Sequence, residues 1–189
     1  MKPACRKGAF RLTILITSIM LGLIPIILGY DLKTTLSYLG TQSRAWFILF
    51  GLATGVAVFL NIKFFAHKTG VKQGRVFHAV LSIGCIAMFS TVLVNSGAQS
   101  GWMHAVHNLS AQIFGTVCFG IMFVLLFVRC KREKVYFLHM AALTAAAIVV
   151  VASMLIIGWA AQFQLSSLLV SLVVLLISNY LTPHRLTRI

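Results

Sequence analysis

Two histidines three residues apart, His104 and His107, stand where a long apolar stretch of the sequence resumes. If that stretch is helical, both imidazoles lie on one face, about 4.5 Å apart along the helix axis. Asp31 follows an earlier apolar stretch, and two nitrogens with one carboxylate could hold a metal ion. The same acid could orient His107 beside a hydroxyl such as Ser37, in the pattern of an activated nucleophile. A third interpretation is that both histidines, with Trp102, form the polar belt of a membrane surface.

The composition is that of an integral membrane protein. Of the 189 residues, 60% are hydrophobic and 10% are charged, whereas a soluble domain carries roughly a quarter charged residues. The net charge of +14 could suggest nucleic-acid binding, but such binding needs a basic face on a folded domain. Here the basic residues lie in short clusters between apolar runs. We therefore expect membrane lipids as partners and no nucleic acid.

Charged residues and turn formers divide the chain into six apolar runs, each close to the ~20 residues that a helix needs to cross a membrane. Two long uncharged stretches are each interrupted by a polar turn, "NSGAQSG" at 95–101 and "GWAAQFQ" at 158–164,. The first run is longer than the apolar core of a signal peptide, so we expect it to stay as an anchor. The sequence predicts an all-α polytopic membrane protein, a single domain over 1–189, with a six-transmembrane-helix bundle whose spans are 12–30, 45–64, 76–95, 104–128, 137–157 and 164–181.

Lys and Arg are divided unequally between the two ends of the predicted spans. One end has only Lys33 and Arg44. The positive-inside rule places the richer end in the cytoplasm, so both termini are predicted to be cytoplasmic. That end has four cations before the first span, four after the second, four after the fourth and two after the sixth, fourteen in all: Lys2, Arg6, Lys7, Arg11, Lys63, Lys68, Lys72, Arg75, Arg129, Lys131, Arg132, Lys134, Arg185 and Arg188.

The remaining polar side chains gather at the outer end of the oriented spans, which predicts an outward-facing polar pocket that binds a lipid headgroup or small amphiphile. A membrane-embedded enzyme of lipid or cell-envelope metabolism, using Asp31 and His107, is the alternative. His107 lies one turn deeper than His104, where an unpaired polar group costs several kcal/mol. It is therefore expected to face inward and to meet Asp31 or the segment around Ser37. The candidate ligand-binding residues are Asp31, Ser37, Arg44, His104, His107 and Asn108.

Two other histidines, His78 and His139, lie at the same depth near the inner ends of their predicted spans. Such a pair could hold a b-type haem, but the outer end lacks a second helix that donates a histidine. A haem protein is therefore the third hypothesis, and no cofactor or metal is expected. The four cysteines follow no metal or redox spacing and are interpreted as structural thiols: Cys5, Cys85, Cys118 and Cys130,.

Small residues in several predicted spans indicate close helix packing. Gly51 and Gly55 form a G-x-x-x-G motif in the second span, which allows two helices to approach closely. Packing within the chain is favoured over a dimer interface, and the oligomeric state stays open. The last span adds hydroxyl residues of the kind that join membrane helices: Ser166, Ser167, Ser171 and Ser178.

The stretch "GYDLKTTLSYLGTQSRAWFILFGLATG", residues 29–55, resembles the bacterial domain of unknown function 998 family. "HNLSAQIFG", from His107, is similar to that family's histidine at the outer start of the fourth helix. The six-helix plan agrees over nearly the whole chain, and the Frag/DRAM-like membrane families are a weaker likeness. The chain departs from the family at Gln164 and Leu165, where the family often carries Glu-Arg. The resemblance implies an uncharacterised multi-pass protein of the bacterial inner membrane.

Overall fold

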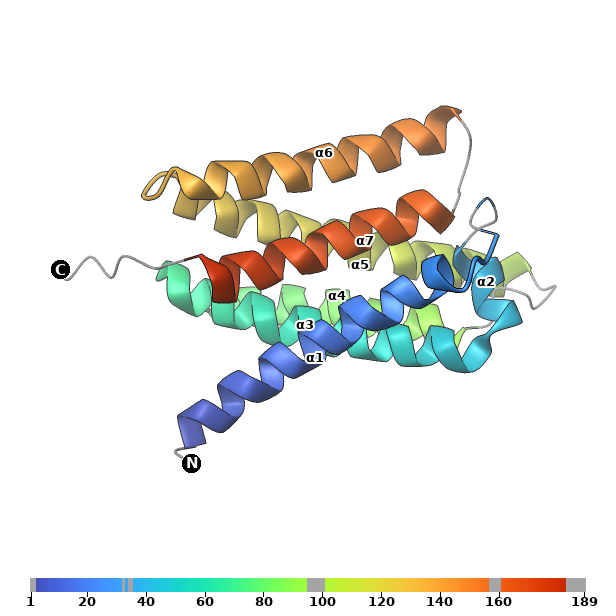
Figure 1. Cartoon of the computed structure of the whole chain (residues 1–189), viewed down its shortest axis with the longest axis horizontal. Coiled ribbons are helices and arrows are strands. Elements are labelled where there is room, and N and C mark those ends of the chain that lie inside the picture. Colours follow the sequence, from blue (N-terminus) through green and yellow to red (C-terminus); the bar gives the residue numbers. More distant parts are fainter. Residues whose placement is uncertain (1–2, 32, 34–35, 95–100, 157–160, 183–189) are drawn as a thin grey trace.

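The computed structural model describes residues 3–31, 33, 36–94, 101–156 and 161–182. All regular secondary structure in these ranges is helical (Figure 1). The helices are α1 (Pro3–Ile27), α2 (Leu36–Gln42), α3 (Arg44–Thr69), α4 (Arg75–Leu93), α5 (Gly101–Cys130), α6 (Val135–Ile156) and α7 (Ala161–Leu176), which continues into a π-helical turn η1 (Ile177–Leu181).

Six helices in the described ranges are long and apolar enough to cross a membrane. They correspond one to one to the six predicted spans, with each boundary a few residues away, so the all-α, multi-pass architecture is confirmed. Two features differ from the prediction. Helix α1 begins at Pro3, because a helix can continue beyond the hydrocarbon while its basic side chains reach water. The seven-residue helix α2 is too short to be recognised from an apolar run.

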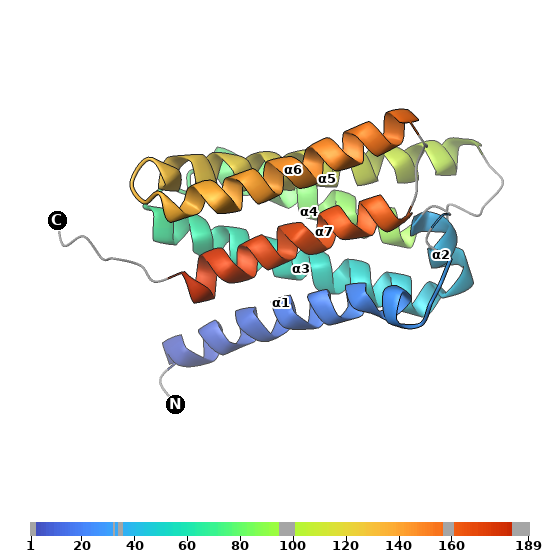
Figure 2. The same cartoon turned by 45° about the horizontal axis from the view of Figure 1, so that its top comes forward.

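Helix α3 is the centre of the bundle. It packs on α1, α2, α4, α5 and α7, whereas α6 packs on α5 and α7 at the edge of the bundle (Figure 2). A Cβ atom at Gly51 would lie 2.0 Å from Cγ1 of Val92, and one at Gly55 would lie 2.7 Å from Cε1 of Phe89. The G-x-x-x-G motif therefore brings α3 against α4 of the same chain, as predicted.

The two ends of the bundle have different composition. The start of α1 and the end of η1 lie at the same end (Figures 1 and 2), together with the segments that join α3 to α4 and α5 to α6. We call this the basic end, because it carries the cations of those segments. The opposite end contains α2, the end of α4 and the start of α5, and we call it the α2 end.

Glycine ends helix α3 at the basic end. Gly70 has a φ of 71°, a left-handed conformation that glycine adopts without steric cost,. Its N–H donates to the carbonyl of His67, and the next N–H, of Val71, donates to the carbonyl of Ala66. This pair of bonds is a Schellman motif. It turns the chain back along α3 before α4 starts at Arg75.

Candidate functional site

The polar residues predicted to line an outer pocket all lie at the α2 end, but they do not form one cluster. Asp31 is exposed, and its Oδ1 accepts a hydrogen bond from the N–H of Lys33 at 3.0 Å. His104 is also exposed, and its Nε2 lies 3.0 Å from Nδ2 of Asn108 on the next turn of α5. Ser37 belongs to the short helix α2. Asp31 and His104 are therefore exposed at the α2 end and make their printed hydrogen bonds to near neighbours in the sequence.

His107 is the buried member of the pair. Its side chain is 2% exposed, and its ring stacks on Phe47 of α3, with 6.4 Å between centroids and an interplanar angle of 29°. The ring lies beside the backbone of Thr91 and Val94 at the end of α4. The inward orientation predicted for His107 is therefore confirmed. The partners found for it belong to α3 and α4, in place of the predicted Asp31.

Arg44 also contacts the end of α4. Its Nη2 donates a hydrogen bond of 2.7 Å to the carbonyl of Leu93, the last residue of α4. The final carbonyls of a helix have no partner within the helix, and cationic or donor groups stabilise them. Arg44 and His107 thus lie at the end of α4, on two neighbouring helices.

A small space at the α2 end lies between α1, α2 and α3. Its volume is about 10 Å³, roughly the volume that one water needs, and its lining residues are Pro25, Tyr30, Leu39, Ser43 and Trp46,.

The acidic residues of the described ranges lie apart from one another. They contain no group of three His, Cys, Asp or Glu side chains that could hold a metal ion. The chain has two acids: Asp31 lies in the exposed turn after α1, and Glu133 forms an ion pair of 2.6 Å with Arg129. His107, by contrast, is buried against Phe47 of α3.

The two histidines of the haem hypothesis lie on helices that do not share an interface. His78 is on α4, which packs on α3 and α5, whereas His139 is on α6, which packs on α5 and α7. His139 is engaged within the bundle, because its Nδ1 lies 3.0 Å from Oγ of Ser178 in η1. It also meets the ring of Tyr136 edge-on at 5.3 Å.

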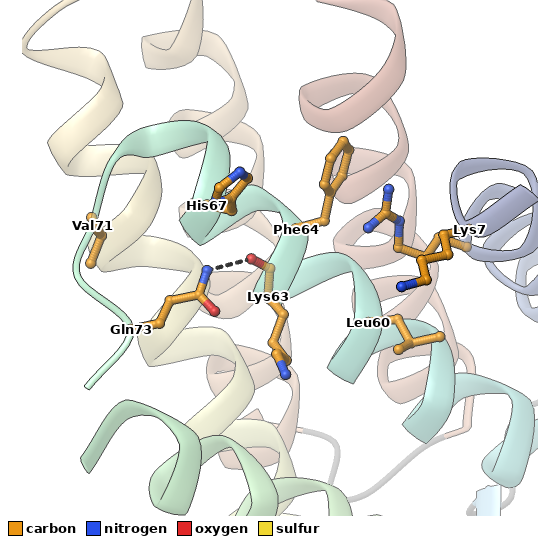
Figure 3. A pocket seen from close by; sticks show the side chains of 8 residues that line it. Lys7, Leu60, Lys63, Phe64, His67, Val71 and Gln73 are labelled. Atoms are coloured by element: carbon orange, nitrogen blue, oxygen red, sulfur yellow. Dashed lines mark hydrogen bonds between the residues drawn. The ribbon is translucent and has the colours of Figure 1, made fainter. Parts of the chain in front are cut away.

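A ligand-sized cavity lies at the basic end, between α1, α3 and the segment that follows α3. Its volume is about 630 Å³, within the range of small-molecule sites, ~300–1,000 Å³. Figure 3 shows Lys7 on the α1 side of this space and Leu60, Lys63, Phe64 and His67 on α3. We call this cavity the basic groove; its lining residues are Lys7, Arg11, Leu60, Lys63, Phe64, His67, Val71 and Gln73.

The walls of the basic groove follow from helical spacing. Lys7 and Arg11 are four residues apart on α1, so they share a face,. On α3, the spacing of Leu60, Phe64 and His67 also places them on one face,. The Schellman turn at Gly70 then returns the chain, and Nε2 of Gln73 donates a 2.8 Å hydrogen bond to the carbonyl of Lys63 (Figure 3).

Arg11 is held from behind by aromatic and amide groups. Its guanidinium carbon lies 3.9 Å from the centroid of the Phe64 ring, a favourable cation–π arrangement. The Tyr180 hydroxyl faces the Arg11 guanidinium and donates a 2.9 Å hydrogen bond to Oδ1 of Asn61. The Asn61 amide in turn donates to the backbone carbonyl of Arg11 at 3.2 Å. The side chain is therefore fixed before any ligand arrives.

A buried polar network continues from this point across the basic end. Asn179 of η1 donates from Nδ2 to the carbonyl of Asn61 at 3.1 Å, and the backbone carbonyl of Asn179 accepts a hydrogen bond from Lys68. Lys68 also lies over the Phe64 ring, 4.8 Å from its centroid. The π-helical turn η1 therefore lies next to Arg11. Turns of this kind occur frequently at functional sites.

Sequence reasoning assigned these cations to membrane orientation and missed the groove. The signal available was the helical spacing of a basic pair on α1 and of a mixed basic and aromatic face on α3. Comparisons of this chain with protein-family models, with curated proteins and with solved structures find no match.

Proposed function

We propose that this chain is a six-span protein of a cell membrane that binds a membrane amphiphile, with both termini in the cytoplasm. The basic end then faces the cytoplasm, where an excess of Lys and Arg is the rule for multi-pass proteins. The α2 end faces outward. The bacterial inner membrane, implied by the resemblance, is retained as part of this proposal.

The observation that carries the proposal is the mixed character of the basic groove. One set of side chains is cationic, Lys7, Arg11 and Lys63, and the other is apolar, Leu60, Phe64 and Val71. A ligand that matches both walls has an anionic or polar head beside a hydrocarbon part. Such a molecule is an amphiphile, and the membrane around the helices supplies amphiphiles at high local concentration.

Binding is favoured over catalysis by the arrangement of the acids and histidines. A general acid or base must reach the reacting group within hydrogen-bond distance. In the described ranges the chain's two carboxylates lie away from the groove, one in the turn after α1 and one paired with Arg129. His67 is the groove's one imidazole among its lining residues, and it has no carboxylate there to orient it.

Mass spectrometry of lipid that co-purifies with the protein in mild detergent tests the proposal. We expect a defined amphiphile at a stoichiometry that survives washing, whereas protein that retains no amphiphile after gentle solubilisation contradicts it. An optical spectrum of the same sample tests the haem hypothesis, because a Soret band would favour His78 and His139 as ligands over the binding role proposed above.

A further inference from the structure

The cations of the basic groove have no carboxylate to neutralise them. The chain has two acidic residues, and the structure describes both. Glu133 is paired with Arg129 at 2.6 Å in the segment between α5 and α6. Asp31 is at the α2 end, the other end of the bundle, in an exposed turn. Within the described residues, no side-chain carboxylate therefore pairs with Lys7, Arg11 or Lys63.

One donor of the Arg11 side chain has no partner among the described residues. Its Nε is buried, and no residue of the described ranges accepts a hydrogen bond from it. Phe64 and Tyr180 hold the guanidinium in place from the bundle side. A fixed guanidinium has a planar pair of donors that matches two oxygens of a phosphate or carboxylate. A buried donor without a partner costs stability, and a bound oxyanion removes that cost.

The flanking cations favour phosphate over a single carboxylate. Lys7 comes from α1 and Lys63 from α3, so point charges stand on both walls of the groove beside the guanidinium. A phosphate group has more oxygens than one arginine can engage, which leaves acceptors for both ammonium groups. The groove also lies near the basic-end termini of the two candidate spans formed by α1 and α3, and the proposed orientation places those termini at the cytoplasmic face.

We propose that the basic groove binds the phosphate headgroup of an anionic lipid from the cytoplasmic leaflet. Arg11 contacts two phosphate oxygens, Lys7 and Lys63 contact the remaining oxygens, and the apolar parts of the lipid lie on Leu60 and Phe64. Basic pockets between transmembrane helices on the cytoplasmic side are a known mode of headgroup recognition. This inference rests on the proposed function and names its ligand class and its contacts.

The test compares two double variants that remove the same charge from the same end of the protein. K7Q/K63Q changes the groove, whereas K131Q/K134Q changes two exposed lysines in the segment between α5 and α6. Full-length protein is titrated in detergent micelles with phosphatidic acid and, separately, with phosphatidylcholine, and lipid-bound species are counted by native mass spectrometry. Circular dichroism melting of each variant verifies that the fold is retained.

We expect the wild-type protein and K131Q/K134Q to bind phosphatidic acid in preference to phosphatidylcholine. K7Q/K63Q should bind phosphatidic acid about 30-fold more weakly, from roughly a fivefold loss for each lysine. Equal losses in the two double variants would overturn the proposal, because they would show general attraction to the basic end. Binding of phosphatidic acid that K7Q/K63Q leaves unchanged would also overturn it, and an amphiphile retained in that case would leave the broader binding function standing.

Inorganic phosphate distinguishes a lipid headgroup from a free anion. The same titration is repeated with inorganic phosphate in excess over the lipid. We expect phosphatidic acid to remain bound, because the walls formed by Leu60 and Phe64 contribute to lipid binding but not to binding of the bare ion,. Full displacement of the lipid by inorganic phosphate would overturn the assignment to a membrane lipid.

Discussion

The two ends of this helix bundle use their polar side chains in opposite ways. At the α2 end, Arg44 donates to the carbonyl of Leu93 at the end of α4, His107 is buried against Phe47, and a space between α1, α2 and α3 is about 10 Å³. At the basic end, Arg11 is fixed by Phe64 but retains a buried donor with no described acceptor, beside a cavity of about 630 Å³. Polar residues at the α2 end hold helix ends together, whereas the basic end combines a buried polar network with an open groove.

Glycines separate the closely packed helix contacts from the open ends of the bundle. Where helices pack, a Cβ atom at Gly22, Gly40 or Gly51 would lie less than 3.0 Å from a neighbouring side chain. A Cβ atom at Gly74 of the basic end, or at Gly101 of the α2 end, would meet nothing within 4 Å. A polar cluster in a sequence therefore indicates a binding site only where the surrounding helices do not close on it. Here the α2 end has the more varied polar residues, whereas the basic end has the groove of about 630 Å³.

The largest effect is expected from Gly51→Ala. The new methyl group would lie 2.0 Å from Cγ1 of Val92, a buried residue of α4, so α3 and α4 must move apart. Overpacking of this kind lowers the free energy of unfolding by about 3 kcal/mol. Thermal unfolding in micelles, followed by circular dichroism, measures the loss. Gly74→Ala, where the new methyl group would meet nothing within 4 Å, is the control, and a comparable loss there would show that contact with α4 is not the cause.

His107→Ala should have the second-largest effect. The substitution removes the stack on Phe47 and the contact with the end of α4, at a side chain that is 2% exposed. We expect a loss of about 2 kcal/mol in the free energy of unfolding. His104→Ala, at an exposed position one turn earlier, should cost less than about 0.5 kcal/mol. Equal effects of the two substitutions in the same unfolding assay would favour the interpretation that both histidines belong to a polar belt at the membrane surface.

Arg44→Gln is expected to give a smaller loss. The variant removes the cation from the carbonyl of Leu93 at the end of α4, and helix-end interactions of this type contribute about 1 kcal/mol. Lys33→Gln removes the other basic residue of the α2 end, from an exposed position, and should leave stability unchanged. Chemical denaturation of the two variants in parallel compares them, and an unchanged midpoint for Arg44→Gln would argue against the capping role.

The architecture was predictable from sequence because membrane spans obey a length rule. Apolar runs bounded by charges predicted the six helices. The G-x-x-x-G motif predicted close helix packing within the chain, and the structure shows that the partner helix is α4. The depth of His107 was enough to predict its burial, but its partners depend on which helix ends meet. Arg44 and His107 are 63 positions apart by subtraction of their numbers, and only the tertiary fold brings both to α4.

The basic groove was not predicted because a cluster of cations in a membrane protein can set the orientation of the spans or line a binding site. Lys7, Arg11 and Lys63 fit the topological role of cytoplasmic cations, and that role alone accounts for their number. Whether they also line a cavity depends on how α1 crosses α3 and on the return of the chain at Gly70.

The serines of α7 do not all join neighbouring helices, because Ser167 and Ser171 donate hydrogen bonds to carbonyls of their own helix. Ser178 in η1 is the one that reaches another helix, at His139.

The central claim is that the basic end faces the cytoplasm and the α2 end faces outward, and side-specific thiol labelling tests it most directly. Single cysteines are introduced into the full-length chain as Thr41→Cys in α2 and Gly74→Cys before α4, both at exposed positions, with Cys5→Ser and Cys130→Ser in the background. A charged, membrane-impermeant maleimide is added to intact cells and then to opened membranes. We predict that the cysteine at position 41 reacts in intact cells and that the cysteine at position 74 reacts only after opening. The reverse pattern, or the same pattern at both positions, would contradict the account.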